Sequence, residues 1–280
     1  MRVWQLRKER WELPPGGGIM GILNVTPDSF SDGGRYDSPD KALQHARRLC
    51  AEGADMIDIG GESTRPGSQE VDEQEEMRRT EPVIRALRRE FPDLRLSIDT
   101  RHVSVARAAL EAGADVVNDI TGLQNPAMRA LCAENPCGII LMHMQGEPRT
   151  MQDRPHYGNV VTEVREFFLQ RVRLAEEAGI DPARLCLDPG IGFGKEVCHN
   201  LSLIRHLEET RVRNLPLLMA LSRKRFMGAV LEDAEAPRVS PLPTVVMSLL
   251  SAGFGADLHR VHDVAALRQA LRLRQATLEA

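Results

Sequence analysis

The chain has 280 residues, of which 42% are hydrophobic and 27% charged, and its formal net charge at pH 7 is −4. This composition is typical of a globular protein and excludes the basic surface that broad nucleic-acid binding requires. No apolar run of about 18 residues could span a membrane, and the first twenty residues lack the apolar stretch of a signal peptide. We therefore expect a cytoplasmic protein without nucleic-acid or membrane partners, whose five cysteines are reduced thiols.

Eight short segments each begin with apolar residues and end with polar or glycine-rich ones. In chain order they span residues 18–30, 54–67, 95–100, 115–122, 138–146, 185–195, 215–224 and 256–263. The connections between them have helical periodicity, as in 160–178, where apolar residues recur every three or four positions. Alternating strands and helices predict the α/β class. We expect one domain over 1–280, a (β/α)₈ TIM barrel with its active site at the carboxyl ends of the strands.

Several connecting segments have features of their own. Residues 1–17 precede the first strand, and we expect Trp4 and Trp11 to cover the bottom of the barrel. Long connections follow the first two strands, at 26–39 and 62–71, and their glycines are typical of mobile lids. The proline-rich segment 231–243 predicts an irregular surface loop, whereas 264–276 predicts a helix with Asp263 as its N-cap.

Carboxylates and amides stand where buried strands end. Asp99 and Asp188 each follow such a strand, and Asn118 lies at the end of another. A buried carboxylate is unfavourable unless it is paired, so it either anchors backbone amides or accepts a ligand's N–H groups. Two carboxylates joined by an asparagine favour the second interpretation. They suit a fused heterocycle with an amidine-like donor edge.

The string GIGFGK at 190–195 imitates a phosphate-binding loop. Pro189 stands where that motif requires glycine, and Glu196 replaces its serine or threonine. A nucleotide-binding loop is therefore disfavoured. We expect a tight turn that brings backbone close to a ligand.

Basic residues follow the last two strands, where TIM barrels often bind phosphate. Ser222 to Arg225 precede a predicted helix at 226–231, which suggests an anion site. Arg260 and His262 lie on the same side of their strand because side chains alternate. His143 ends the fifth strand, and core hydrogen bonding and catalysis are equally compatible with that position. No metal cage is evident, so a metal would be a hard ion such as Mg²⁺, for which Asn24 could supply one oxygen.

Taken together, these motifs resemble those of the dihydropteroate synthase family. The resemblance runs from ILNVTPDSFSDGG at 22–34 through GGESTRPG, SIDT, NDI, MHMQG and DPGIGFGK to SRK and RVHDV. It implies a transferase of folate biosynthesis, a family that sulfonamides inhibit. Such an enzyme condenses 6-hydroxymethyl-7,8-dihydropterin diphosphate with p-aminobenzoate, releasing diphosphate and forming 7,8-dihydropteroate. It also implies Mg²⁺ as cofactor and a homodimer formed through helices late in the chain.

The resemblance assigns roles to matching positions, and no residue is assigned as a general base. The implied pterin site comprises Asp99, Asn118, Met142, Asp188, Lys224 and Arg260. The implied diphosphate site comprises Asn24, Thr64, Arg260 and His262, with Asn24 also as the Mg²⁺ ligand. The implied p-aminobenzoate site comprises Phe30, Arg65, Pro66, Phe193 and Ser222, with the carboxylate at the helix start near Ser222 to Arg225.

The chain departs from the family pattern at Ala220, where glycine is common, and in the helix at 242–254. Two other functions stay open at this stage. One is a pterin-binding methyltransferase barrel, which would share the carboxylates but not need the basic groups after strands seven and eight. The other is a non-catalytic pterin-binding paralogue. An activity assay separates them.

Overall fold

The computed structural model describes residues 2–25, 38–62, 71–147 and 150–280. Eight parallel strands form one sheet in the order β8-β7-β6-β5-β4-β3-β10-β9. A bridge between Leu187 and Leu217, with the Leu187 amide donating to the Pro216 carbonyl at 2.8 Å, joins the two outer strands. The predicted TIM barrel is therefore confirmed. Its strands are β3 (Gly18–Asn24), β4 (Met56–Gly60), β5 (Arg95–Asp99), β6 (Val116–Asp119), β7 (Gly138–Met142), β8 (Leu185–Asp188), β9 (Leu218–Met219) and β10 (Leu258–Val261).

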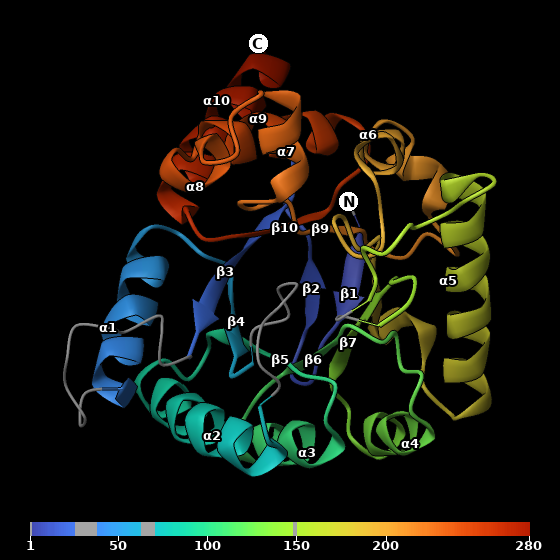
Figure 1. The fold of residues 1–280 in the computed structure, drawn as a ribbon. Coiled ribbons are helices and arrows are strands. Elements are labelled where there is room, and N and C mark those ends of the chain that lie inside the picture. The colour runs from blue at the N-terminus through green and yellow to red at the C-terminus, as the bar shows by residue number, and fades with distance from the viewer. Residues whose placement is uncertain (1, 26–37, 63–70, 148–149) are drawn as a thin grey trace.

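Helices surround the strands as an outer ring (Figure 1). The predicted apolar stripe of 160–178 is buried, with Val164 and Phe168 fully inaccessible to solvent. Side-chain caps begin several of these helices, for example Asp72, whose carboxylate accepts the Gln74 amide at 3.1 Å. The helices are α1 (Ser38–Ala51), α2 (Glu73–Glu90), α3 (Val103–Ala112), α4 (Pro126–Glu134), α5 (Val160–Glu177), α6 (Val197–Arg205), α7 (Arg225–Val230), α8 (Ala236–Val239), α9 (Leu242–Gly253) and α10 (Val264–Glu279). None that the structure describes is long and apolar enough to cross a bilayer.

Two local predictions are confirmed only in part. Asp263 is the N-cap residue of α10, as predicted, but its side chain makes no capping hydrogen bond and lies 3.3 Å from the guanidinium of Arg223 instead. The segment 231–243 is exposed as predicted but not wholly irregular. Pro237 lies at the start of α8, where a missing N–H removes no helical hydrogen bond, and α9 already begins at Leu242.

An antiparallel hairpin, β1 (Val3–Gln5) with β2 (Arg10–Glu12), packs against the first residues of the barrel strands. Trp4 and Trp11 face each other across it with ring centroids 6.3 Å apart, and the Trp4 indole N–H donates to the Arg184 carbonyl at 2.9 Å. Their cluster includes residues from the start of seven strands: Met20, Met56, Val116, Ile140, Cys186, Leu218 and Leu258. The amino-terminal end of the barrel is therefore filled with side chains.

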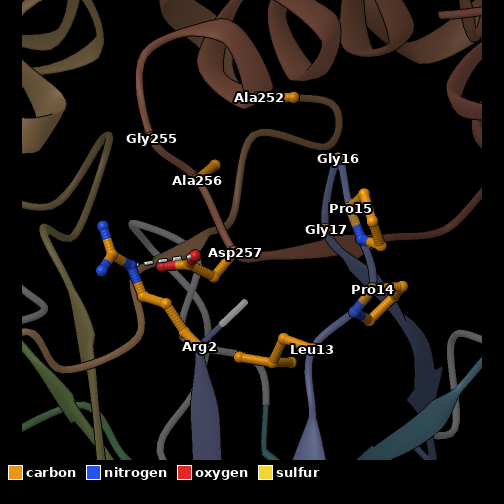
Figure 2. A pocket seen from close by; sticks show the side chains of 10 residues that line it. All are labelled: Arg2, Leu13, Pro14, Pro15, Gly16, Gly17, Ala252, Gly255, Ala256 and Asp257. Atoms are coloured by element: carbon orange, nitrogen blue, oxygen red, sulfur yellow. Dashed lines mark ion pairs between the residues drawn. The ribbon is translucent and has the colours of Figure 1, made fainter. Parts of the chain in front are cut away.

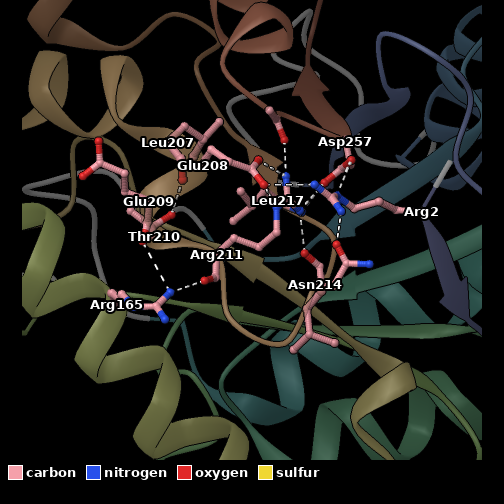
Figure 3. Close-up of polar contacts among 12 residues, drawn as sticks. Arg2, Arg165, Leu207, Glu208, Glu209, Thr210, Arg211, Asn214, Leu217 and Asp257 are labelled. Atoms are coloured by element: carbon pink, nitrogen blue, oxygen red, sulfur yellow. Dashed lines mark hydrogen bonds and ion pairs between the residues drawn. The ribbon is translucent and has the colours of Figure 1, made fainter.

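Ion pairs tie the N-terminal residues to this same end (Figure 3). The buried Arg211 donates to Asp257 at 2.7 Å and to Glu208 at 2.8 Å. Arg2 reaches both of these carboxylates, at 3.2 and 3.1 Å. The Asp257 carboxylate also accepts the Leu217 amide at 2.9 Å, just before β9. Because these charges pair with one another, this end of the barrel offers little for a ligand to bind.

Candidate functional site

The strand register places one row of polar residues at the opposite, carboxyl end. Asn24 pairs with Gly60, Gly60 with Asp99, and Asp99 with Asn118, across β3 to β6. Asn24, Gly60 and Asn118 each lie an even number of positions after a residue of the tryptophan cluster at the other end, so the two-residue period of a strand turns these positions inward. Asp99 joins them through its contact with Arg260. The structure thus brings together side chains that are 94 positions apart in sequence, Asn24 and Asn118.

Arg260 links three strands inside the barrel. Its Nε donates to Asp58 at 2.6 Å and its Nη2 to Asp99 at 2.7 Å. The Asn118 amide also donates to Asp58, at 3.2 Å. The guanidinium predicted to contact pterin and diphosphate is therefore held between two carboxylates, which fixes its orientation before any ligand binds.

Asp58 is a site residue that sequence reasoning missed, because only residues at strand ends were considered. Its signal was a single carboxylate within the buried strand MIDIG. Asp58 is fully buried, and its second oxygen, Oδ1, has no hydrogen-bond partner among the residues described. The hydroxyl of Ser97, in register with Asp58 on β5, is also buried without a partner. Buried polar groups of this kind normally bind water or ligand.

Burial governs the electrostatics of the carboxylates. It raises the pKa of Asp99, and the Arg260 charge opposes this. It also raises the pKa of Asp188, which the Gly190 amide and Lys224 oppose. The surrounding carboxylates raise the pKa of Arg260 above its usual value despite burial. Each carboxylate is therefore stabilised as an anion only by a few specific donors, which suits recognition of a donor-rich ligand.

The turn after β8 holds Asp188 in place. The Gly190 amide donates to Asp188 Oδ1 at 2.7 Å. Gly190 has φ +66°, and a β-carbon there would lie 1.8 Å from the carbonyl oxygen of His143. The backbone of this turn thus packs directly against the end of β7, as the predicted close approach required, with Met142 alongside.

Lys195 is a second residue that sequence reasoning missed. Its buried ammonium lies 2.9 Å from His143 Nδ1, 3.0 Å from the Gly190 carbonyl and 2.9 Å from the Phe193 carbonyl. Three acceptors match the three N–H groups of a protonated lysine, although burial lowers its pKa to about 7. The sequence feature that could have indicated this role is the position of Lys195 at the end of the string that imitates a phosphate-binding loop.

His143 supports this turn and does not face a ligand. Burial and Lys195 lower its pKa to about 2, so its imidazole is neutral and accepts from Lys195. Its ring also meets the edge of Phe167, with centroids 4.9 Å apart. Of the two interpretations left open by the sequence, these contacts favour core hydrogen bonding.

Aromatic and basic groups flank the carboxylates. The Lys224 ammonium lies 4.2 Å from the centre of the Phe193 ring and packs against Gly192. Ser222 Oγ lies 2.9 Å from His262 Nδ1 and accepts the His262 backbone amide at 3.2 Å. The hydroxyl hydrogen is then available for Nδ1, which leaves Nε2 as the protonated nitrogen of a neutral His262. The helix predicted at 226–231 is α7, which begins and ends one residue earlier.

Four predicted site residues lie outside the described residues: Phe30, Thr64, Arg65 and Pro66. The predicted lids at 26–39 and 62–71 fall largely in the same gaps.

A pocket of about 430 Å³ lies at the other end of the barrel, before β3 and β10 (Figure 2). Prolines and glycines form much of its lining, including Pro14, Pro15, Gly16 and Gly17. Its charged lining residues, Arg2 and Asp257, pair with each other at 3.2 Å. It therefore lacks the converging polar groups found around Asp99 and Asp188.

Comparison with known proteins matches the chain to characterised relatives. A family model described as "Pterin binding enzyme" matches residues 20–262. Dihydropteroate synthase of Escherichia coli strain K12 is 44% identical over 262 residues, covering 94% of this chain and 92% of the relative. The Yersinia pestis enzyme, solved with a sulfonamide drug, is 44% identical with a TM-score of 0.91, covering 99% of this chain and 100% of that one. The Xanthomonas albilineans enzyme was solved with 4-aminobenzoic acid (45% identity, TM-score 0.88, 94% of each chain) and with 7,8-dihydropteroate (41%, 0.88, 99% of each).

Proposed function

The chain belongs to the dihydropteroate synthases within the pterin-binding enzyme family, and on that premise we propose how its residues hold the two substrates. It is a transferase that joins a dihydropterin diphosphate to p-aminobenzoate. The observation that carries the proposal for the site is the row of inward polar residues at the carboxyl end, with Arg260 fixed between Asp58 and Asp99. The relatives and solved structures described above are dihydropteroate synthases, which favours this function over the methyltransferase alternative.

The pterin occupies the interior of the barrel between Asp99, Asn118 and Asp188. Its amino-pyrimidinone edge donates to Asp188, whose oxygens keep lone pairs beyond the one that accepts Gly190. Met142 and Arg260 lie against its faces, and Lys224 donates to its carbonyl side. The unpartnered Asp58 Oδ1 and Ser97 hydroxyl at the bottom of this space support a polar ligand or its water there.

The diphosphate lies at the mouth of the barrel, near Asn24, Thr64, Arg260 and His262. In the reaction the amine nitrogen of p-aminobenzoate forms a bond to the pterin methylene carbon. The methylene C–O bond breaks, and its electron pair leaves with the diphosphate. The proton released from nitrogen passes to diphosphate or water, so no dedicated base is required. Arg260 and the Nε2–H of His262 stabilise the departing charge.

The p-aminobenzoate lies above the pterin, against Phe193 and towards Ser222. Phe193 is already positioned by Lys224 over its ring, and Ser222 by His262. Phe30, Arg65 and Pro66 complete this site in our proposal.

Mg²⁺ fits the oxygen donors at the mouth of the barrel. Gly60 lacks a side chain, and the position of its missing β-carbon lies 3.8 Å from Asn24 Oδ1 and 3.9 Å from Asp99 Oδ2. The absent side chain leaves room beside two hard oxygen donors, the kind that Mg²⁺ prefers. Asn24 would hold the ion, which when bound neutralises charge on the diphosphate.

We further propose that the enzyme acts as a homodimer through α9 and α10. The burial pattern of α9 is the reverse of the usual one. Its buried face carries the polar residues Thr244, Ser248 and Ser251. Its exposed side chains include the apolar Leu242, Val246 and Leu250. Leu273 of α10 is 72% exposed. A contiguous exposed apolar surface of this kind is typical of an interface between subunits. We also propose a single domain with 1–17 covering the barrel bottom, and a cytoplasmic location, supported by the five free cysteines.

The test is diphosphate release from synthetic dihydropterin diphosphate and p-aminobenzoate, with and without Mg²⁺. We expect Mg²⁺-dependent turnover, and Asn24→Ala should weaken binding of the diphosphate substrate while leaving binding of the bare pterin nearly unchanged. Pterin binding without turnover would identify a non-catalytic paralogue. Equal loss of both ligands in calorimetry would instead give Asn24 a role in folding.

A further inference from the structure

A second cluster of polar side chains lies between the end of β4 and the starts of α2 and α3, made of residues not assigned to either substrate. Glu62 follows β4, Glu76 lies in the first turns of α2, and His102 immediately precedes α3. His102 Nε2 is 3.9 Å from Glu62 Oε2 and 3.9 Å from Glu76 Oε2. All three potential ligand atoms lie within 4.8 Å of one another.

The Glu76 carboxylate is part of this cluster, and the Thr100 side chain is the polar group that opposes the effect of burial on its pKa. It is fully buried, and neither of its carboxylate oxygens makes a well-formed hydrogen bond to a described residue. His102 Nε2 is likewise buried without such a bond. A buried carboxylate facing an imidazole nitrogen is unfavourable unless something lies between them, since each lacks the partner that burial demands.

The other nitrogen of His102 is oriented as in known metal sites. His102 Nδ1 lies 3.2 Å from Glu73 Oε1, and the Ser104 hydroxyl donates to the same carboxylate. The His102 backbone amide is fixed by Thr100 Oγ1 at 3.1 Å. A histidine that ligates a metal almost always donates its second N–H to such an outer carboxylate, which directs the lone pair of the first nitrogen at the ion.

The charged side chains at this cluster carry a net negative charge, which a cation would balance. Arg101 pairs with Glu62 Oε1 at 3.4 Å, so Glu62 Oε2 is the oxygen that faces His102. Two carboxylates at the cluster are thus balanced by one guanidinium, with Glu73 as a third carboxylate behind the imidazole.

We propose that Glu62, Glu76 and His102 bind one divalent transition-metal ion of the zinc class, with Glu73 as the outer partner of His102. One imidazole and two carboxylates suit zinc, whereas Mg²⁺ favours oxygen donors alone. Its ligands are different residues from the oxygen donors of the Mg²⁺ site proposed at Asn24. An ion there ties the end of β4 to α2 and α3, so it stabilises the folded enzyme.

The experiment titrates the metal-free full-length enzyme with Zn²⁺ by calorimetry and with Co²⁺ by absorption spectroscopy. An exposed cluster of Glu196, Cys198 and His199 could also take up zinc, so a C198S/H199A variant serves as the background. In this background we expect one Zn²⁺ per chain, visible cobalt bands, and a Zn²⁺-dependent rise in melting temperature. Excess Mg²⁺ should not displace the ion.

Substitutions in that background locate the site. His102→Ala and Glu76→Gln should each weaken Zn²⁺ binding by at least about 100-fold, and Glu73→Gln by about 10- to 100-fold. Circular dichroism checks that each variant is folded. If the variants at the buried positions do not fold, Glu73→Gln still tests the site, because the Glu73 side chain is half exposed. No Zn²⁺ uptake in the background variant, or uptake unchanged by these substitutions, overturns the proposal.

Discussion

At the scale of single residues, the site is a set of buried charges that depend on one another. Asp58 and Asp99 share Arg260, while Asp188 relies on a backbone amide and on lysines. Removing one partner of a buried ion pair typically costs about 3–5 kcal/mol, because the other charge stays behind unpaired. The residues that we propose to bind substrate are therefore also buried charges that need partners within the folded protein.

Asp188→Asn tests recognition at this scale. The amide keeps the volume but offers one oxygen, and it places an NH₂ where the pterin also presents a donor. Hydrogen bonds to a charged group contribute roughly 1.5–3 kcal/mol each, so we expect a loss on the order of 2–4 kcal/mol, or about 30- to 1,000-fold in pterin affinity by calorimetry.

Asp119→Asn is the matched control for that substitution. Asp119 is also buried at a strand end, but it accepts from Thr121 and Leu123 and follows the inward Asn118. It should lower the melting temperature and leave pterin affinity unchanged. Pterin affinity of Asp188→Asn within about threefold of wild type would return Asp188 to a structural role.

At the scale of elements, the turn between β8 and α6 positions Asp188 through a backbone hydrogen bond and through close backbone packing. Its glycines lie against carbonyl oxygens of the segment after β7: Gly190 against His143 and Gly194 against Gln145. The buried Lys195 ammonium contacts both segments, at His143 after β7 and at the Phe193 carbonyl in the turn. A rigid turn of this kind places the carboxylate before the ligand arrives.

Gly190→Ala should disrupt this turn. Its β-carbon would meet the His143 carbonyl oxygen at 1.8 Å, in addition to the left-handed strain of about 1–2 kcal/mol. Gly179→Ala is the control, because Gly179 has φ +87° but no atom within 4 Å of the added carbon. Denaturant unfolding should show only the strain for Gly179→Ala and a clearly larger loss, with loss of pterin binding, for Gly190→Ala. Equal destabilisation by both would contradict the close packing.

The contact between β10 and the N-terminal segment should depend on pH. His259 is fully buried, and its Nε2 lies 3.1 Å from the Gly16 carbonyl. Burial lowers its pKa to about 4. The unfolded chain, with a histidine pKa near 6.5, therefore binds more protons below pH 6.5, and the free energy of unfolding falls between pH 6.5 and about 4.

His259→Gln isolates this effect from other titrating groups. At about 1.36 kcal/mol per pKa unit, the stability advantage of wild type over His259→Gln should shrink by about 2 kcal/mol between pH 7 and pH 5. Urea unfolding at the two pH values measures it. Parallel pH curves for the two proteins would show that His259 does not titrate in this way.

At the scale of the whole molecule, the two ends of the barrel have different roles. The amino-terminal end is closed by the tryptophan hairpin and by paired charges around Arg211. The carboxyl end collects buried polar groups with few partners. Outside the barrel, α9 turns apolar residues outward, which leaves a surface that a second copy would cover.

The dimer is tested by placing charge on that surface. We expect wild type to be a dimer by light scattering at micromolar concentration, and V246E/L250E to be a folded monomer, because both side chains are nearly half exposed on one face of α9. Leu169→Glu on α5, at 46% exposure, should remain dimeric. A monomeric wild type, or a dimer that survives the double substitution, excludes this interface.

The sequence by itself determined the eight strands, the helices between them and most of the polar residues at the site. Each of these depends on local patterns: apolar runs predict strands, a 3.6-residue period predicts helices, and the ends of parallel strands meet at one edge. The family resemblance added the substrates.

Only the tertiary structure decided which partner each buried group has. Asp58 and Lys195 were missed because their roles depend on Arg260 and His143, which are 202 and 52 positions away. The Asp263 side chain makes no capping hydrogen bond and instead lies beside Arg223, from another strand end. The three-residue metal cluster likewise arises where β4, α2 and α3 converge. A helix or strand can be predicted from local sequence, because the residues that favour it are neighbours in the chain. The pairing of buried charges cannot, because it depends on which distant side chains the closed barrel brings into contact.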